Sequence, residues 1–134
     1  GGGMDLCGVP GECDVAVAAN LFADILSGVA AVVRGSMGLA PSANINPDRE
    51  YPSLFEPVHG AAFDIMGKGI ANPLATVSAV AMMLDHLGEQ EAADRVDKAV
   101  ARCLEQRTVL TVDLGGTAST SVMGDEAARL IREG

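Results

Sequence analysis

Tryptophan is absent from this chain of 134 residues, and aromatic residues account for only 3% of it. The core must therefore be aliphatic, and a hydrophobic fraction of 49% supplies the material for one. Together with a charged fraction of 20%, this composition excludes a disordered chain and is typical of a globular protein. A chain of this length favours one domain with a real core.

Positive charge is also scarce, because nine Lys and Arg residues stand against 18 Asp and Glu residues, a formal net charge of -9. Such a surface repels phosphate groups, so we expect no binding to nucleic acid or to an anionic membrane. No uninterrupted apolar run reaches the roughly 18 residues that a bilayer-spanning helix needs. The first residues, Gly1-Gly2-Gly3, lack the basic-then-apolar order of a signal peptide.

Paired cysteines are missing as well. Cys7, Cys13 and Cys103 cannot all pair within the chain, and none belongs to a C-x-x-C motif. Buried or free thiols in a reducing compartment are favoured over a disulfide or a zinc site, so we expect a cytoplasmic protein. Residues 1–12 hold five glycines and one proline without hydrophobic periodicity, which predicts a flexible glycine-rich lead-in. A start at Gly1 rather than Met leads us to expect a fragment, a scar or a rearranged start.

Hydrophobic periodicity predicts alternating helices and strands, the pattern of an α/β protein. Asn20, Asn72-Pro73, and Ser119 or Thr120 each precede a helical pattern and are suited to cap it. The expected elements are a strand at 14–18, a helix at 21–34, a strand at 54–58, helices at 73–87 and 89–106, a strand or extended piece at 109–112, and a helix from 119 or 120 to about 132.

The helix expected at 21–34 has two distinct faces. One is a broad apolar stripe at helical spacing, compatible with core burial or with packing against a second copy. The other places Asn20, Asp24 and Gly28 in one row, since residues four apart align on a helix. The apolar stripe consists of Phe22, Ile25, Leu26, Val29, Val32 and Val33.

The chain contains no P-loop, no G-x-G-x-x-G, no G-x-S-x-G and no H-E-x-x-H motif, and it has only two histidines. Four other stretches occur in this order: NLFADILS at 20–27, LAPSANINP at 39–47, FEPVHGAAFDIMGKGIANP at 55–73 and DLGGTAST at 113–120. Together they resemble the metal-dependent β-decarboxylating dehydrogenases, the family of the isocitrate, 3-isopropylmalate and tartrate dehydrogenases. The stretch 44–49 looks most like the tartrate dehydrogenase branch.

The resemblance covers about residues 13–134 and implies an α/β fold, namely a C-terminal fragment of the isopropylmalate dehydrogenase-like two-domain fold. Residues 13–35 would be a strand–helix piece of the dimer-forming domain. Residues 36–134 would form the C-terminal part of the cofactor-binding domain. In this family a helix like 21–34 packs against its partner's copy, so the resemblance implies a homodimer.

The resemblance also implies that the loop 59–72 binds NAD through His59, Gly60, Ala61, Ala62, Asp64 and Asn72. Asp64 would accept hydrogen bonds from ribose hydroxyls and repel a 2′-phosphate, which favours NAD over NADP. Asn72 is equally well explained as a helix cap, and both roles are compatible. Ala61 and Phe63 depart from the family, which usually has a hydroxyl residue and a proline at these positions.

For the metal, the family pattern places two aspartates four apart on the helix 21–34, where their oxygens hold Mg²⁺ or Mn²⁺. This chain has Asp24 and Gly28 there, so we expect weak or absent metal binding. Asp24 is also explained by its interaction with the helix dipole. A third aspartate, a catalytic lysine and the arginines that bind the substrate belong upstream in the family, so no catalytic residue is assigned here.

Two functional hypotheses follow. In the first, the chain is a segment of an NAD-dependent, divalent-metal-dependent oxidative decarboxylase of a 2-hydroxy dicarboxylic acid of the tartrate, D-malate or 3-isopropylmalate class, inactive on its own. In the second, it is a non-catalytic, truncated or degenerate relative that acts as a nucleotide-binding or dimerisation module.

Overall fold

The computed structural model describes residues 15–33 and 35–134. The lead-in predicted at 1–12 lies outside the described residues. The four predicted helices are confirmed, and each end lies within one residue of its expected position. No described helix is long and apolar enough to cross a membrane. The elements are α2 (Asn20–Val33), η2 (Met37–Leu39), β1 (Pro41–Asn44), β2 (Leu54–Pro57), α3 (Leu74–Leu87), α4 (Gln90–Gln106), η3 (Val112–Leu114) and α5 (Thr120–Glu133).

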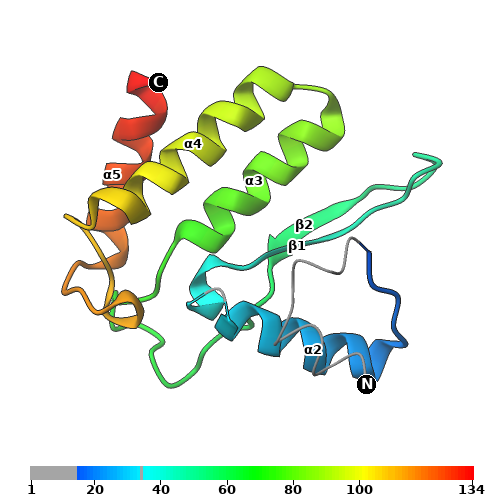
Figure 1. Ribbon diagram of the computed structural model, residues 1–134, viewed down its shortest axis with the longest axis horizontal. Coiled ribbons are helices and arrows are strands. Elements are labelled where there is room, and N and C mark those ends of the chain that lie inside the picture. Colours follow the sequence, from blue (N-terminus) through cyan, green and yellow to red (C-terminus); the bar gives the residue numbers. More distant parts are fainter. Residues whose placement is uncertain (1–14, 34) are drawn as a thin grey trace.

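Helices α3, α4 and α5 form the body of the molecule, with α3 and α4 as an antiparallel hairpin and α5 against α4 (Figure 1). Gly88 permits the reversal between α3 and α4 because it adopts a left-handed φ of 88°. Cys103 lies in the core as a free thiol, and burial raises its pKa. The core cluster consists of Leu74, Ala99, Cys103, Leu110, Met123, Ala127 and Leu130.

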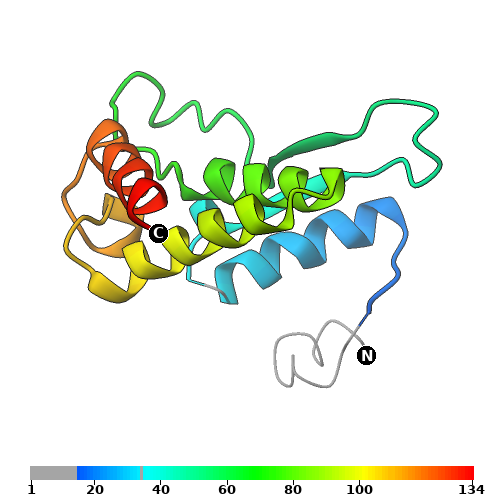
Figure 2. The same cartoon turned by 90° about the horizontal axis from the view of Figure 1, so that it is seen from above.

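The two strands pair antiparallel, with Pro41 opposite Pro57 and Asn44 opposite Leu54. They lie against α3, and the hairpin between them extends away from the helical body (Figures 1 and 2). The strand predicted at 54–58 is confirmed as β2. Helices and strands thus form the mixed fold that the sequence predicts, and β2 leads directly into the loop 59–72.

One strand prediction is wrong, and a second holds only in its alternative form. Residues 15–18 form no strand, and Val15 and Val17 are 85% and 96% exposed. The physical reason is that a strand needs a hydrogen-bonded neighbour, and no described segment pairs with these residues. The piece predicted at 109–112 as a strand or extended forms no strand: Val109 lies in a bend, Thr111 is extended, and Val112 begins the 3₁₀ turn η3.

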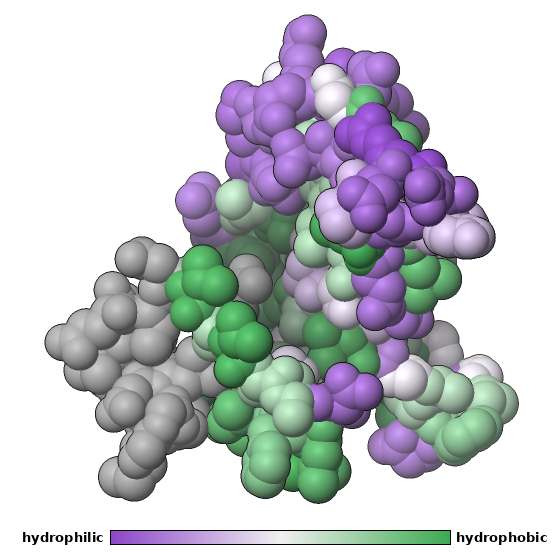
Figure 3. Space-filling model, turned by 90° about the vertical axis from the view of Figure 1, so that its right-hand side faces the viewer, coloured by the Kyte–Doolittle hydropathy of each residue, from purple (hydrophilic) through white to green (hydrophobic). Residues whose placement is uncertain are grey.

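Helix α2 exposes most of its apolar stripe. Phe22 is 63% exposed, Ile25 56% and Val32 65%, and Ala31 is the one buried residue described in the helix. Hydrophobic side chains are concentrated in the lower half of Figure 3, the level at which α2 lies in Figure 1. Packing against the described residues therefore does not account for the stripe.

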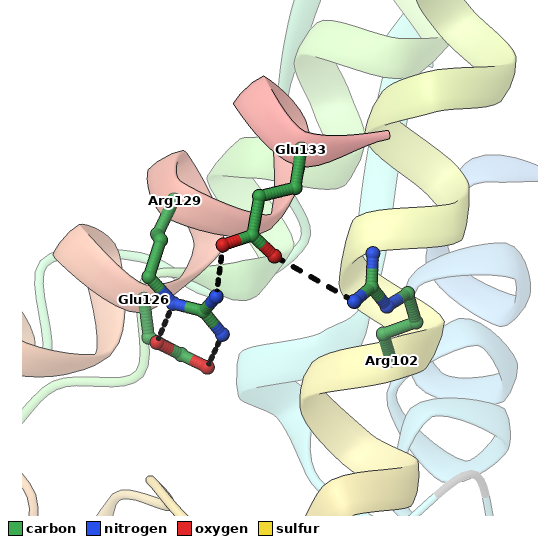
Figure 4. A network of polar contacts seen from close by, with 4 residues as sticks. All are labelled: Arg102, Glu126, Arg129 and Glu133. Atoms are coloured by element: carbon green, nitrogen blue, oxygen red, sulfur yellow. Dashed lines mark hydrogen bonds and ion pairs between the residues drawn. The ribbon is translucent and has the colours of Figure 1, made fainter.

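A polar network joins α4 to α5 on the surface (Figure 4). Arg129 pairs with Glu126 at 2.7 Å and also with Glu133, which in turn lies 3.8 Å from Arg102 of α4. Arg102, Arg129 and Glu133 are solvent-exposed and Glu126 is partly covered. Surface ion pairs of this kind add little to stability, because water screens the charges. Buried apolar contacts, rather than this network, hold α5 in place.

Candidate functional site

Three connecting segments meet around one cavity of about 400 Å³. They are the turn at 36–38 before β1, the loop 59–72 between β2 and α3, and the segment 112–113 before α5. The volume is within the range of small-molecule sites. The walls are mostly apolar, and the polar lining comes from four side chains. The apolar wall is formed mainly by Met37, Ile65, Ile70 and Val112, and the polar lining by Ser36, His59, Asn72 and Asp113.

Asp113 connects the three segments through hydrogen bonds. Its Oδ2 accepts from Ser36 Oγ at 2.5 Å and from Asn72 Nδ2 at 3.0 Å, and its Oδ1 accepts from Thr111 Oγ1 at 2.5 Å. Partial desolvation acts to raise the pKa of Asp113, but these hydrogen bonds to the ionised form outweigh it, so the pKa lies below its usual value. An ionised carboxylate therefore fixes the geometry of this side of the cavity.

The side chain of Asn72 makes two hydrogen bonds within the chain. Its Nδ2 donates to Asp113, and its Oδ1 accepts the backbone N–H of Leu74 at 2.9 Å, which caps the start of α3. Asn72 is also nearly buried. The cap role predicted from the sequence is thus confirmed, and one Nδ2 hydrogen and one lone pair of Oδ1 remain for a ligand.

Gly38 permits the close approach of the first segment to the others. A Cβ at this position would lie 2.7 Å from Asn72 Cβ and 3.0 Å from Asp113 Oδ2. A larger residue would therefore push the turn at 36–38 away from α3 and from Asp113.

The loop 59–72 is held in place by turns and by α5. The N–H of Ile65 donates to the carbonyl of Ala62 at 3.0 Å, and Ala62 adopts a left-handed φ of 45°. Thr120 anchors the far end, because its N–H donates to the carbonyl of Gly69 at 2.8 Å and its Oγ1 to that of Ala71 at 2.6 Å. The left-handed conformation of Ala62 costs conformational energy, since it is not a glycine. Residues strained in this way are enriched in functional loops.

Three of the predicted cofactor residues, His59, Ala62 and Asn72, line this cavity. Gly60, Ala61 and Asp64 lie exposed on the same loop and do not belong to its lining. His59 Nδ1 lies 3.0 Å from the carbonyl oxygen of Gly60, which can only accept. The tautomer that makes this contact a hydrogen bond has its proton on Nδ1, and its Nε2 is then an acceptor.

The predicted metal ligand Asp24 lies on the exposed surface of α2. One turn further on, Gly28 has open space where a Cβ would project. Within 15–33 and 35–134, no three His, Cys, Asp or Glu residues are grouped closely enough to hold a metal ion. The described residues alone therefore do not fit a resident metal.

Sequence reasoning assigned no role to Ser36, Gly38 or Asp113, although all three shape the cavity. Asp113 did open the fourth quoted motif, directly after an extended hydrophobic segment. A carboxylate directly after an extended segment is the feature of the sequence that could have identified Asp113 as a site residue. Ser36 offered none, since its partner is 77 residues away in the sequence.

Comparison with known proteins gives one consistent result. Residues 2–127 match the family model described as isocitrate/isopropylmalate dehydrogenase. A probable tartrate dehydrogenase/decarboxylase of Agrobacterium vitis is 54% identical over 122 residues, which are 91% of this chain and 34% of that protein. Homoisocitrate dehydrogenase of Methanocaldococcus jannaschii is 49% identical over 130 residues, 97% of this chain and 36% of that protein.

A solved structure agrees with these relatives. The crystal structure of isocitrate dehydrogenase from Methylococcus capsulatus matches with a TM-score of 0.89 and 43% identity, over 97% of this chain and 38% of that one. The chain thus spans about a third of the length of the curated relatives it matches.

Proposed function

Because the chain belongs to the isocitrate/isopropylmalate dehydrogenase family, we propose that it is a segment of an oxidative decarboxylase of a 2-hydroxy dicarboxylic acid. The cavity at the loop 59–72 takes the adenosine part of NAD, and the substrate belongs to the tartrate, D-malate or 3-isopropylmalate class. The parent enzyme is a cytoplasmic homodimer. The observation that carries this proposal is the joint placement of His59, Ala62 and Asn72 around one cavity.

The cavity suits a purine nucleoside for two reasons. First, its apolar wall, which includes Ile65 and Ile70, can cover a flat ring. Second, the Nε2 of His59 can accept a hydrogen bond from an exocyclic amino group. Asp64 is at the tip of the turn whose ends, Ala62 and Ile65, both line the cavity. A carboxylate there accepts hydrogen bonds from ribose hydroxyls and repels a 2′-phosphate.

The role of this chain is therefore to bind and orient the dinucleotide. Bound NAD supplies the acceptor for the hydride that leaves the hydroxyl carbon of the substrate. Asp113 and Asn72 fix the polar side of the cavity before the ligand arrives, which lowers the ordering cost of binding. No three metal-binding side chains are grouped among the described residues, so we assign those residues no part in the metal-assisted loss of CO₂.

Titration calorimetry with NAD and NADP tests the cofactor assignment. We expect NAD to bind more tightly, and Asp64→Lys to shift the preference toward NADP, because the 2′-phosphate would then meet a cation. Asp48→Lys, an equal charge change on the exposed hairpin away from the cavity, is the matched control and should leave the preference unchanged. Equal or tighter binding of NADP by the unaltered chain would contradict the proposal.

The same proposal predicts no turnover by this chain alone. Tartrate, D-malate, isocitrate and 3-isopropylmalate, each with NAD and Mn²⁺, should give no rise of NADH absorbance. Positioning by a base, an acid and a substrate clamp contributes several kcal/mol to such reactions, and no described residue is assigned to these roles. A steady rise that Asp24→Ala abolishes would show that the chain is a complete enzyme.

One observation favours the second candidate, a non-catalytic nucleotide-binding or dimerisation module. Gly28 replaces the second carboxylate of the row on α2, although the open space there would accept an aspartate. The exposed stripe of α2 would then serve dimerisation alone. Sedimentation of the unaltered chain and of Ile25→Asp tests the dimer, which the variant should dissociate.

A further inference from the structure

Phe63 is the most exposed of the described aromatic side chains, with 81% of its surface accessible. Single exposed apolar residues are common and need no explanation by themselves. Phe63 differs because of its position, which the turn Ala62–Ile65 determines. The backbone hydrogen bond from Ile65 to Ala62 closes this turn, and Phe63 and Asp64 are its two central residues.

Both ends of that turn belong to the cavity lining, whereas Phe63 and Asp64 do not, so the exposed tip of the turn lies beside the lining, at its rim. Ala62 adopts a left-handed conformation, which costs conformational energy in a residue other than glycine. This conformation sets the direction in which the backbone leaves the cavity wall. The rim therefore carries an aromatic ring and a carboxylate side by side. The wall beside them is formed by aliphatic side chains, including Ile65 and Ile70.

We propose that Phe63 stacks on the adenine ring and so acts as a purine-recognition residue of the nucleotide site. This inference rests on the proposed function, since it assumes that the cavity binds the adenosine part of a dinucleotide. A flat ring needs two apolar faces to leave water completely, and the aliphatic wall supplies only one. Phe63 supplies the second, while the neighbouring Asp64 remains free for the ribose.

The stack has a measurable consequence for specificity. Stacking on an aromatic residue depends on the base and not on the phosphate or the ribose. Loss of the Phe63 ring should therefore weaken binding of AMP by about tenfold, within the usual range for such contacts. Binding of nicotinamide mononucleotide, which has a ribose and a phosphate but no purine, should not change.

Proton NMR of the chain titrated with AMP is the direct test, because the chain has only three phenylalanines and two histidines. We expect nuclear Overhauser contacts between the Phe63 ring and the adenine protons H2 and H8. Phe63→Ala should remove them and lower AMP affinity about tenfold, whereas Phe63→Tyr should retain both. Met66→Ala is the matched control, since Met66 is 60% exposed on the same loop but lies outside the turn Ala62–Ile65.

The possible results separate this inference from the proposed function. AMP that shifts the His59 and Ile70 resonances without contacts to Phe63, and with equal affinity for Phe63→Ala, overturns the stacking and leaves the nucleotide site standing. AMP that does not bind at all overturns both.

Discussion

Helices α2 and α4 both show helical periodicity of their apolar residues, yet their apolar faces lie in opposite environments. Helix α4 buries Ala93, Val96, Ala99 and Cys103 against its neighbours. Helix α2 buries only Ala31 among its described residues and exposes its larger apolar side chains. Periodicity therefore identifies an apolar face but does not say what covers it. For α4 the cover is in this chain, and for α2 we propose that it is a second copy.

The substitution with the largest expected effect on stability is at Gly116, which lies directly against the backbone of Leu110. A Cβ on Gly116 would lie 1.9 Å from the carbonyl oxygen of Leu110, and backbone cannot move aside as a flexible side chain does. We expect Gly116→Ala to lower the free energy of unfolding by about 4 kcal/mol, at the upper end of overpacking effects. Urea unfolding followed by circular dichroism measures the loss.

Gly124→Ala is the control for this substitution. Gly124 lies within α5 with open space around its Cβ position, so alanine should stabilise the helix by about 0.5–1 kcal/mol. Two variants of similar stability would mean that the segment around Leu110 does not pack against Gly116.

A matched pair of truncations compares the two helical regions directly. Leu130 is 1% exposed in the body, so Leu130→Ala should cost about 3 kcal/mol of unfolding free energy. Ile25 is 56% exposed on α2, so Ile25→Ala should cost less than about 0.5 kcal/mol when the chain is dilute. Under the proposed dimer, the cost of Ile25→Ala increases with protein concentration. An equal, concentration-independent cost for both would show that α2 packs within its own chain.

Asp113 gives a smaller effect with a defined pH dependence. Replacement by Asn removes the charge that accepts three hydrogen bonds, and we expect a loss of about 1–2 kcal/mol at pH 7. The pKa of Asp113 is lowered on folding, so its stabilisation is complete above the ordinary value of 3.8 and disappears as the pH falls through the lower folded value.

Thermal unfolding of the original chain and of Asp113→Asn across acidic pH measures this difference. The two curves should converge below pH 3.8. A stability difference that stays constant down to low pH would mean that the charge of Asp113 is irrelevant to the fold.

The smallest effect concerns metal binding on α2. Gly28→Asp restores a second carboxylate one turn after Asp24, in open space. In the complete parent enzyme we expect Mn²⁺ binding to become at least tenfold tighter, equivalent to about 1.4 kcal/mol, as measured by titration calorimetry. Gly28→Asn has the same shape without the charge and should have much less effect. Unchanged affinity in Gly28→Asp would mean that this face of α2 does not bind the ion.

The sequence predicted those parts of the fold that local patterns determine. Helix ends followed from residues such as Asn72, Gly88 and Ser119, each of which acts on neighbouring backbone. The strand predicted at 14–18 failed because a strand depends on a neighbour that local patterns do not reveal. His59 and Asn72 were found through a motif contiguous in sequence, whereas the contact of Ser36 with Asp113 arises only from folding.

Hydrogen exchange of the chain with and without NAD, followed by mass spectrometry, tests the central claim most directly. Our account assigns nucleotide binding to the loop 59–72 and the segment around Asp113, and assigns the face of α2 to a protein partner. NAD should therefore slow exchange in peptides covering 59–72 and 111–116 and leave 20–33 unchanged. Protection confined to 20–33, or no protection at saturating NAD, would contradict the account.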